Sequence, residues 1–227
     1  MLKRSLIIGI IAAPLLVAPA HAQSWDTPEF YSPKPMDDLG LYYVHNTEEF
    51  FSAKHGTYEP NGLKVIWRQT GNINLGLQGG FGDLKDLGGA ILLGAEAGKS
   101  LSSLSANGLA AAWSLGAGAV FGSHYVDLAI PLGVSIGLNL GSGFTPYVHP
   151  RVSFDLASVD NAIGSGSTTT TDVGLAVDLG VELNLGQTLL ARAAYTAGNR
   201  NNSIGKRSAF GAGLALRIPR KVVVRGR

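Results

Sequence analysis

Apolar and polar side chains alternate strictly between Tyr125 and Leu140, where every even-numbered position is apolar. The odd-numbered positions carry mostly polar or small side chains. Successive side chains of a β-strand point to opposite faces, so the pattern predicts one long strand with a single apolar face. At about 3.3 Å per residue and a tilt near 40°, this strand would rise roughly 35 Å, enough to cross an outer membrane.

The same period of two continues through residues 144–156 and 172–185. Strands of soluble sandwiches average about five or six residues, whereas consecutive strands of more than a dozen are ordinary in a membrane barrel. The pattern therefore predicts an all-β fold, an antiparallel up-and-down transmembrane β-barrel of about ten strands, with eight as the alternative. The predicted strands are Leu39–His45, Gly62–Thr70, Asn72–Gly82, Gly89–Gly98, Gly108–Gly122, Tyr125–Leu140, Phe144–Ala157, Thr171–Leu185, Thr188–Thr196 and Ser208–Ile218.

Tight turns and long loops connect these predicted strands. In outer-membrane barrels the short turns face the periplasm and the longer loops face the cell exterior. With an even number of strands, both termini are then predicted to lie in the periplasm. The tight, Gly-bearing turns are at 71, 141–143 and 186–187, and the long loops are at 46–61, 158–170 and 197–207.

The N-terminus has the features of an export signal. Lys3 and Arg4 are followed by an apolar stretch at 6–18 and by an A-x-A cleavage site at 20–22. The apolar stretch is shorter than the roughly 20 residues of a membrane-spanning helix, so we predict cleavage after Ala22 and export to the cell outer membrane. The predicted organisation is a signal peptide at 1–22, a periplasmic leader at 23–38, the barrel at 39–218 and a basic tail at 219–227.

Composition narrows the classes of function. The predicted signal holds two of the 18 basic residues and none of the 16 acidic ones, so the mature chain is formally neutral and no nucleic-acid binding is expected. The chain has no cysteine, which excludes disulfides and thiolate metal sites. Outside the signal, no apolar run is long enough for a transmembrane helix, which leaves strands of a closed barrel to cross the membrane.

The last predicted strand reads Ser-Ala-Phe-Gly-Ala-Gly-Leu-Ala-Leu-Arg-Ile from Ser208 to Ile218. With this strand, the export signal and the two-residue repeats, the chain resembles the small OmpA-type outer-membrane barrels. The resemblance implies contact with outer-membrane lipid and insertion by the barrel-assembly machinery. The terminal strand of that family commonly ends in an aromatic residue, whereas residues 219–227 follow here.

Charges of both signs fall on the predicted inner face. A barrel of about ten strands is only slightly wider than the eight-stranded barrels whose interiors are filled by side chains, so we predict a filled lumen. The alternative is a narrow passage for small polar solutes. The predicted lumen charge network consists of Lys64, Arg68, Glu96, Asp127, Arg151, Asp155, Asp178, Glu182 and Arg192.

Hairpin geometry predicts partners within this lumen charge network. Folding residues 171–185 onto the strand before them places Arg151 beside Asp178, within one register step. Folding the same residues onto the strand after them places Arg192 diagonally between Asp178 and Glu182. A buried charge without a partner costs several kcal/mol, so these groups are expected to pair.

Two further features concern local structure. Pro131, Pro146 and Pro150 lie inside predicted strands and remove backbone donors, which predicts a bulge or bend at that place. Residues 23–38 are neither strand-like nor helical, and we predict that they form either a disordered periplasmic leader or a short plug.

Catalysis on such a barrel would need a His near a carboxylate or a Ser. His149 and Ser153 share the inner face but are roughly 13 Å apart along the strand, and His124 lies beside Asp127 at a rim. No enzyme activity, cofactor or metal is expected. The expected function is a structural or surface-interaction role with an unknown surface ligand. A small-solute channel is the first alternative, and a lipid-modifying enzyme or protease is less favoured.

Overall fold

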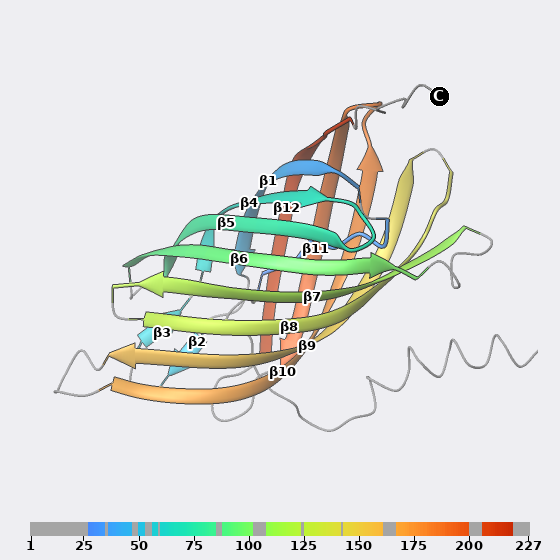
Figure 1. Cartoon of the computed structure of the whole chain (residues 1–227). Coiled ribbons are helices and arrows are strands. Elements are labelled where there is room, and N and C mark those ends of the chain that lie inside the picture. The colour runs from blue at the N-terminus through green and yellow to red at the C-terminus, as the bar shows by residue number, and fades with distance from the viewer. Residues whose placement is uncertain are drawn as a thin grey trace, which may run out of the picture.

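Ten strands form one closed antiparallel barrel in the computed structural model of the 227-residue chain (Figure 1). The structure describes residues 27–34, 36–46, 50–52, 56–58, 60–84, 88–101, 108–123, 125–141, 143–160, 167–199 and 206–219. The barrel strands are β1 (Asp38–Asn46), β4 (Pro60–Gln69), β5 (Asn74–Leu84), β6 (Gly88–Ser100), β7 (Leu109–Gly122), β8 (Tyr125–Leu138), β9 (Phe144–Asp160), β10 (Ser167–Asn184), β11 (Leu189–Asn199) and β12 (Lys206–Arg217).

Each strand pairs with its neighbours in sequence, and β1 closes the barrel by pairing with both β4 and β12. This arrangement confirms the predicted ten-stranded up-and-down topology. A separate hairpin of β2 (Phe50–Ser52) and β3 (Gly56–Tyr58) lies in the long connection between β1 and β4. In Figure 1 this hairpin is at the end of the barrel toward which β7 and β9 run.

The predicted strands β9 and β10 are too short at the rim that carries the long loops. β9 continues to Asp160 and β10 starts at Ser167, so their hairpin shortens the predicted 158–170 loop. Ser and Thr residues there pair across the hairpin, as Ser167 does with Asp160. Polar pairs of this kind lack the apolar alternation from which strand ends were predicted.

Pro131 and Pro150 interrupt the backbone ladders without shifting them. The β7–β8 pairing stops after Leu115–Leu132 and resumes at Gly118–Ala129 in the same register. The β8–β9 pairing has a similar gap next to Pro150, again with no change of register. Of the predicted bulge or bend, the bulge is wrong, because each proline removes a donor but no extra residue is inserted. The interrupted ladders still leave the barrel less regular at these two prolines.

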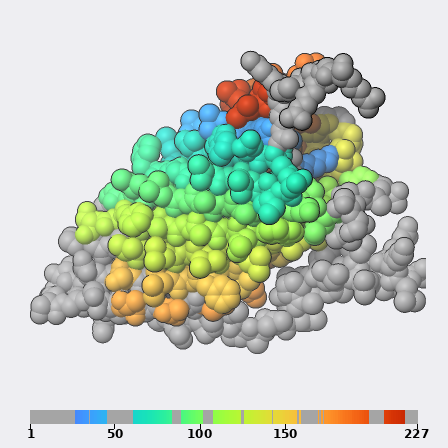
Figure 2. Space-filling view, in the orientation of Figure 1, coloured from blue at the N-terminus to red at the C-terminus, as the bar shows by residue number. Residues whose placement is uncertain are grey.

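The outer wall is apolar and the inner wall is polar. On β10, Leu179 faces outward with 57% of its surface exposed, whereas its neighbour Asp178 faces inward and is fully buried. The same alternation holds along β8, as the sequence predicted. Figure 2 shows the continuous outer surface that the side chains of β4 to β9 present. This construction defines a transmembrane β-barrel.

The two ends of the chain lie largely outside the described residues. The predicted signal peptide and its cleavage site at 1–22 are not among them, and neither is most of the basic tail at 219–227. Within the described part of the chain, no helix has the length and apolar character needed to cross a bilayer. The position of residues 27–34 is the main departure from a simple barrel.

Candidate functional site

Residues 27–34 form a plug inside the barrel. Glu29, Phe30 and Tyr31 are at most 5% exposed, and Pro28 and Pro33 are fully buried. Of the two alternatives that the sequence left open for 23–38, the described part follows the short plug. The plug brings an acid and two aromatic rings into a lumen that the strands alone were expected to fill.

Phe30 anchors the plug on the barrel wall. Its ring stacks on that of Tyr42 from β1, with centroids 4.1 Å apart and planes 18° from parallel. Its backbone φ of 52° lies in the left-handed region that bulky residues rarely adopt. A hydrogen bond from the Ser32 N–H to the Phe30 carbonyl, 3.1 Å long, closes the turn that this conformation makes. The plug therefore has a defined shape, fixed by stacking and by its own turn.

Three lumen cations bind four consecutive backbone carbonyls of the plug. Arg151 Nη2 donates to the Thr27 carbonyl at 3.1 Å, and Lys64 Nζ donates to the Pro28 carbonyl at 3.4 Å. Arg68 donates to the next two carbonyls, those of residues 29 and 30, at 2.8 and 3.1 Å. The lumen thus satisfies the plug backbone much as a neighbouring strand would.

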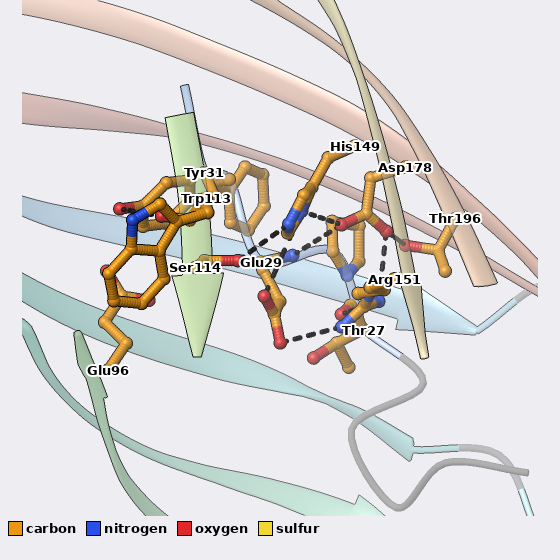
Figure 3. A network of polar contacts seen from close by, with 12 residues as sticks. Thr27, Glu29, Tyr31, Glu96, Trp113, Ser114, His149, Arg151, Asp178 and Thr196 are labelled. Atoms are coloured by element: carbon orange, nitrogen blue, oxygen red, sulfur yellow. Dashed lines mark hydrogen bonds and ion pairs between the residues drawn. The ribbon is translucent and has the colours of Figure 1, made fainter. Parts of the chain in front are cut away.

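The Arg151–Asp178 pair lies at the centre of the site. Arg151 Nη2 is 3.0 Å from Asp178 Oδ1, and Arg151 Nη1 is 2.9 Å from the plug carboxylate, Glu29 Oε1. Thr196 on β11 donates a second hydrogen bond to Asp178 Oδ1, at 2.6 Å. In Figure 3 both carboxylates face Arg151 and His149. The wall pairing is the one that hairpin geometry predicted, and the plug adds a second acid to it.

His149 connects this ion pair to a serine on another strand. Its Nδ1 is 3.2 Å from Asp178 Oδ2, and its Nε2 is 2.9 Å from the Ser114 hydroxyl on β7 (Figure 3). A carboxylate held by Arg151 can only accept hydrogen bonds, so Nδ1 carries the proton. In the neutral imidazole, Nε2 then accepts the proton of Ser114. The chain Ser114–His149–Asp178 has the connectivity of a charge-relay triad.

The aromatic ring of Tyr31 covers His149 from the plug side. The two ring centroids are 5.6 Å apart, and the Tyr31 hydroxyl donates to the Trp113 carbonyl at 3.3 Å. Burial raises the pKa of the Tyr31 hydroxyl to about 12, so this group stays protonated as a donor. The triad is consequently enclosed by β7, β9, β10 and the plug.

Arg192 is the centre of a second buried cluster of polar side chains, near the rim that carries the short turns. It donates to Glu182 Oε2 at 2.8 Å, to Asp38 Oδ2 at 2.6 Å and to the Tyr42 hydroxyl at 2.9 Å. The predicted position between Asp178 and Glu182 is wrong for Asp178. The β10–β11 register places Arg192 directly opposite Glu182 and Thr196 opposite Asp178. Its second acid comes from β1, which barrel closure brings near.

The remaining members of the lumen charge network occupy the same inner wall. Arg68 pairs with Glu96 on β6 and is also 5.5 Å from the centre of the Tyr31 ring. Asp155 accepts a 2.7 Å hydrogen bond from Ser153, and Asp127 is fully buried nearer the rim with the long loops. Ser153 thus bonds a carboxylate, while the serine that reaches His149 is Ser114.

The sequence analysis did not identify several residues of this site, among them Glu29, Asp38, Tyr42, Ser114 and Thr196. The sequence offered serines on the strand of His149 as its partners, whereas Ser114 lies two strands away on β7 and reaches His149 over Gly133 of β8. A buried Ser in an inward position of β7 was visible in the sequence, but its partner was not. Among the described residues, no group of three or more His, Asp or Glu side chains could hold a metal ion.

The fold and the site define a closed transmembrane β-barrel with an internal plug. No protein-family model and no curated protein matches the sequence. Among solved structures, the chain is similar to Neisserial surface protein A, with a TM-score of 0.45 and 13% identity over 80% of this chain and 96% of that one. It is also similar to the outer membrane protease OmpT from Escherichia coli, with a TM-score of 0.42 and 10% identity over 82% of this chain and 97% of that one. The function must therefore be inferred from the side chains of this chain.

Proposed function

We propose that the protein is an exported outer-membrane barrel with a closed lumen and a structural or surface-interaction role. The observation that carries this proposal is the plug, whose carbonyls and Glu29 carboxylate are bound by Arg151, Lys64 and Arg68 inside the barrel. Every one of these lumen side chains is at least 94% buried. A lumen filled in this way supports closure against a steady flow of solutes.

Location is the first part to test. The exposed leucines of the outer wall would be unstable in water over so large an area, and lipid is the solvent they fit. We expect the mature protein to fractionate with outer membranes and to migrate differently on gels before and after heating. Recovery of a soluble periplasmic form would rule out this part of the proposal.

Closure is tested by electrical conductance in planar lipid bilayers. The purified full-length protein should give no steady steps above the baseline, because the plug and the ion pairs occupy the lumen. A useful reference is the variant Glu29→Ala/Phe30→Ala, which removes the plug carboxylate and the stacked ring and should conduct. Steady openings of the unsubstituted protein would favour the narrow channel instead.

The surface role is supported by the β9–β10 hairpin. These strands have 17 and 18 residues, longer than the roughly 9 to 11 residues that cross a membrane. Their far ends, rich in Ser and Thr, should therefore stand above the lipid on one side of the membrane. The proposed orientation places this hairpin outside the cell, where it could meet a surface partner.

Single cysteines test this orientation, because the chain has none of its own. Thr169, an exposed residue of the β9–β10 hairpin, and Thr188, an exposed residue of the turn before β11, lie at opposite rims. A membrane-impermeant maleimide should label Thr169→Cys on intact cells and Thr188→Cys only after the outer membrane is opened. The reverse pattern would mean that the barrel is inserted the other way.

A further inference from the structure

The Ser114–His149–Asp178 chain has no evident use in a barrel that is only a structural element. Each of the three side chains is at most 3% exposed, and all three come from different strands. We propose that Ser114 is the nucleophile of a masked acyl-transfer site that takes small carboxylic esters, and that the plug covers this site in the closed barrel. The part of this proposal in which the plug covers the site rests on the proposed closed lumen. The contacts among Ser114, His149 and Asp178 depend only on the strands of the barrel wall.

The wall orients the Asp178 carboxylate toward His149. Asp178 is fixed by Arg151 and Thr196 through Oδ1, which leaves Oδ2 to accept from His149 Nδ1. His149 Nε2 can then accept the Ser114 proton at the moment of attack, and Asp178 stabilises the imidazolium that forms. Thr196 is a positioning residue in this scheme, since its hydroxyl donates to Asp178 and not to the reacting atoms.

The plug itself shows how an acyl group could be held. Arg151 Nη2 donates a hydrogen bond to the Thr27 carbonyl oxygen at 3.1 Å. A guanidinium that binds a carbonyl oxygen therefore already lies next to the Ser114–His149–Asp178 chain. In place of the plug, an ester carbonyl on the same guanidinium would have its developing negative charge stabilised there. This gives Arg151 a role in addition to its pairing with Asp178.

The reaction balances as an ordinary two-step acyl transfer. Ser114 Oγ bonds to the ester carbonyl carbon while its proton moves to His149 Nε2, and that proton leaves with the alcohol as the ester C–O bond breaks. Water then attacks the acyl-serine, giving its proton to His149. The carboxylic acid is released and the proton returns to Ser114 Oγ. Only the ester and water are consumed.

Access is the step that the plug controls. Tyr31 covers the imidazole at 5.6 Å between ring centroids, and Glu29 Oε2 is 4.0 Å from His149 Nδ1. Truncating these two plug side chains should open space next to Ser114 while leaving the wall strands unchanged. Ser153 offers a matched control, because it is another fully buried inward serine, but it donates to Asp155 and not to an imidazole.

The test uses a fluorophosphonate probe on the full-length protein in detergent. In the variants Tyr31→Ala and Glu29→Ala/Tyr31→Ala we expect labelling at least tenfold above that of the unsubstituted protein, with the probe mapped to Ser114. Adding Ser114→Ala or His149→Gln should abolish labelling, and adding Ser153→Ala should leave it unchanged. The same plug variants should hydrolyse p-nitrophenyl acetate with a dependence on Ser114.

Failure of this inference can be separated from failure of the closed barrel. No labelling in either plug variant, or labelling that persists after Ser114→Ala, overturns the nucleophile proposal whatever the conductance is. Conductance of the unsubstituted protein overturns closure whatever the labelling is. Heat-dependent gel migration of each variant shows that it is folded, and should His149→Gln misfold, the Ser114→Ala comparison still decides the outcome.

Discussion

Leu179 and Asp178 are neighbours on β10, yet they belong to two regions of the barrel held by different forces. The outer wall meets lipid, and Leu179 is 57% exposed there with no specific partner needed. The lumen meets the plug, and Asp178 has contacts with His149, Arg151, Thr196 and the Glu29 backbone. The outer wall requires only an apolar side chain, whereas the lumen requires particular atoms at particular distances.

Substitutions are therefore expected to affect stability for different reasons in the two regions. Lipid accommodates apolar side chains of many shapes, so outer positions are sensitive to polarity and depth rather than to geometry. A buried ion pair is sensitive to the loss of either partner, because the remaining charge has no water to solvate it. An inner position that tolerates substitution as well as an outer one would contradict this distinction between lumen and outer wall.

The largest effect is expected for Asp178→Asn, which keeps the shape of the side chain but removes its charge. Removing one partner of a buried ion pair costs about 3–5 kcal/mol of unfolding free energy, and the remaining Glu29 contact with Arg151 favours the lower end. Leu179→Met on the adjacent outer position should leave stability nearly unchanged. Urea unfolding in lipid vesicles measures both, and equal stabilities of the two variants would contradict the comparison.

A smaller effect is expected for a charge placed on the outer wall. Leu132 lies in the middle of β8, where Leu132→Arg should cost about 2–4 kcal/mol of insertion free energy. Leu140 is also exposed but follows the end of β8, so Leu140→Arg should cost only about 0–1 kcal/mol near the interface. Folding yields into lipid vesicles would measure the difference. If both arginines were equally costly, depth would not govern this wall.

The smallest effect is expected for the loss of a single hydrogen bond in the lumen. Thr196→Val removes the hydroxyl that donates to Asp178 Oδ1 while keeping the branched shape. A hydrogen bond to a charged group contributes about 1.5–3 kcal/mol, and the other partners of Asp178 favour the lower end. Thr188→Val, on an exposed turn, is the control and should change unfolding little. A null result at Thr196 would show that Arg151 and His149 alone fix the carboxylate.

The fold was largely predictable because a membrane barrel repeats one local rule. Alternation along β8 and β10 set which residues face lipid, and Gly-bearing turns such as 141–143 set the connections. The strand ends at Asp160 and Ser167 escaped prediction, since the residues there lack the apolar alternation that marks the rest of each strand. The prolines of β8 and β9 interrupt the ladders without the bulge that was one of the two expected outcomes, because a missing donor does not require an inserted residue.

The candidate site was predictable only where two partners sit on adjacent strands. Arg151 and Asp178 belong to one hairpin, so counting residues from the loop was enough to bring them together. Ser114 and His149 are two strands apart, and their contact depends on Gly133 of β8 between them, where an added side chain would collide with the His149 ring. No periodicity within either strand carries that information.

Local alternation along the strands is enough to predict a barrel with an apolar outside and a charged inside, because side-chain facing in a strand is a local property with a period of two. What fills the lumen depends instead on contacts between residues far apart in the chain. Glu29 lies 149 positions from Asp178, and Asp38 lies 154 positions from Arg192. Contacts over such separations follow from barrel closure and from the entry of residues 27–34 into the lumen, where buried cations need the carbonyls and carboxylates that the plug supplies.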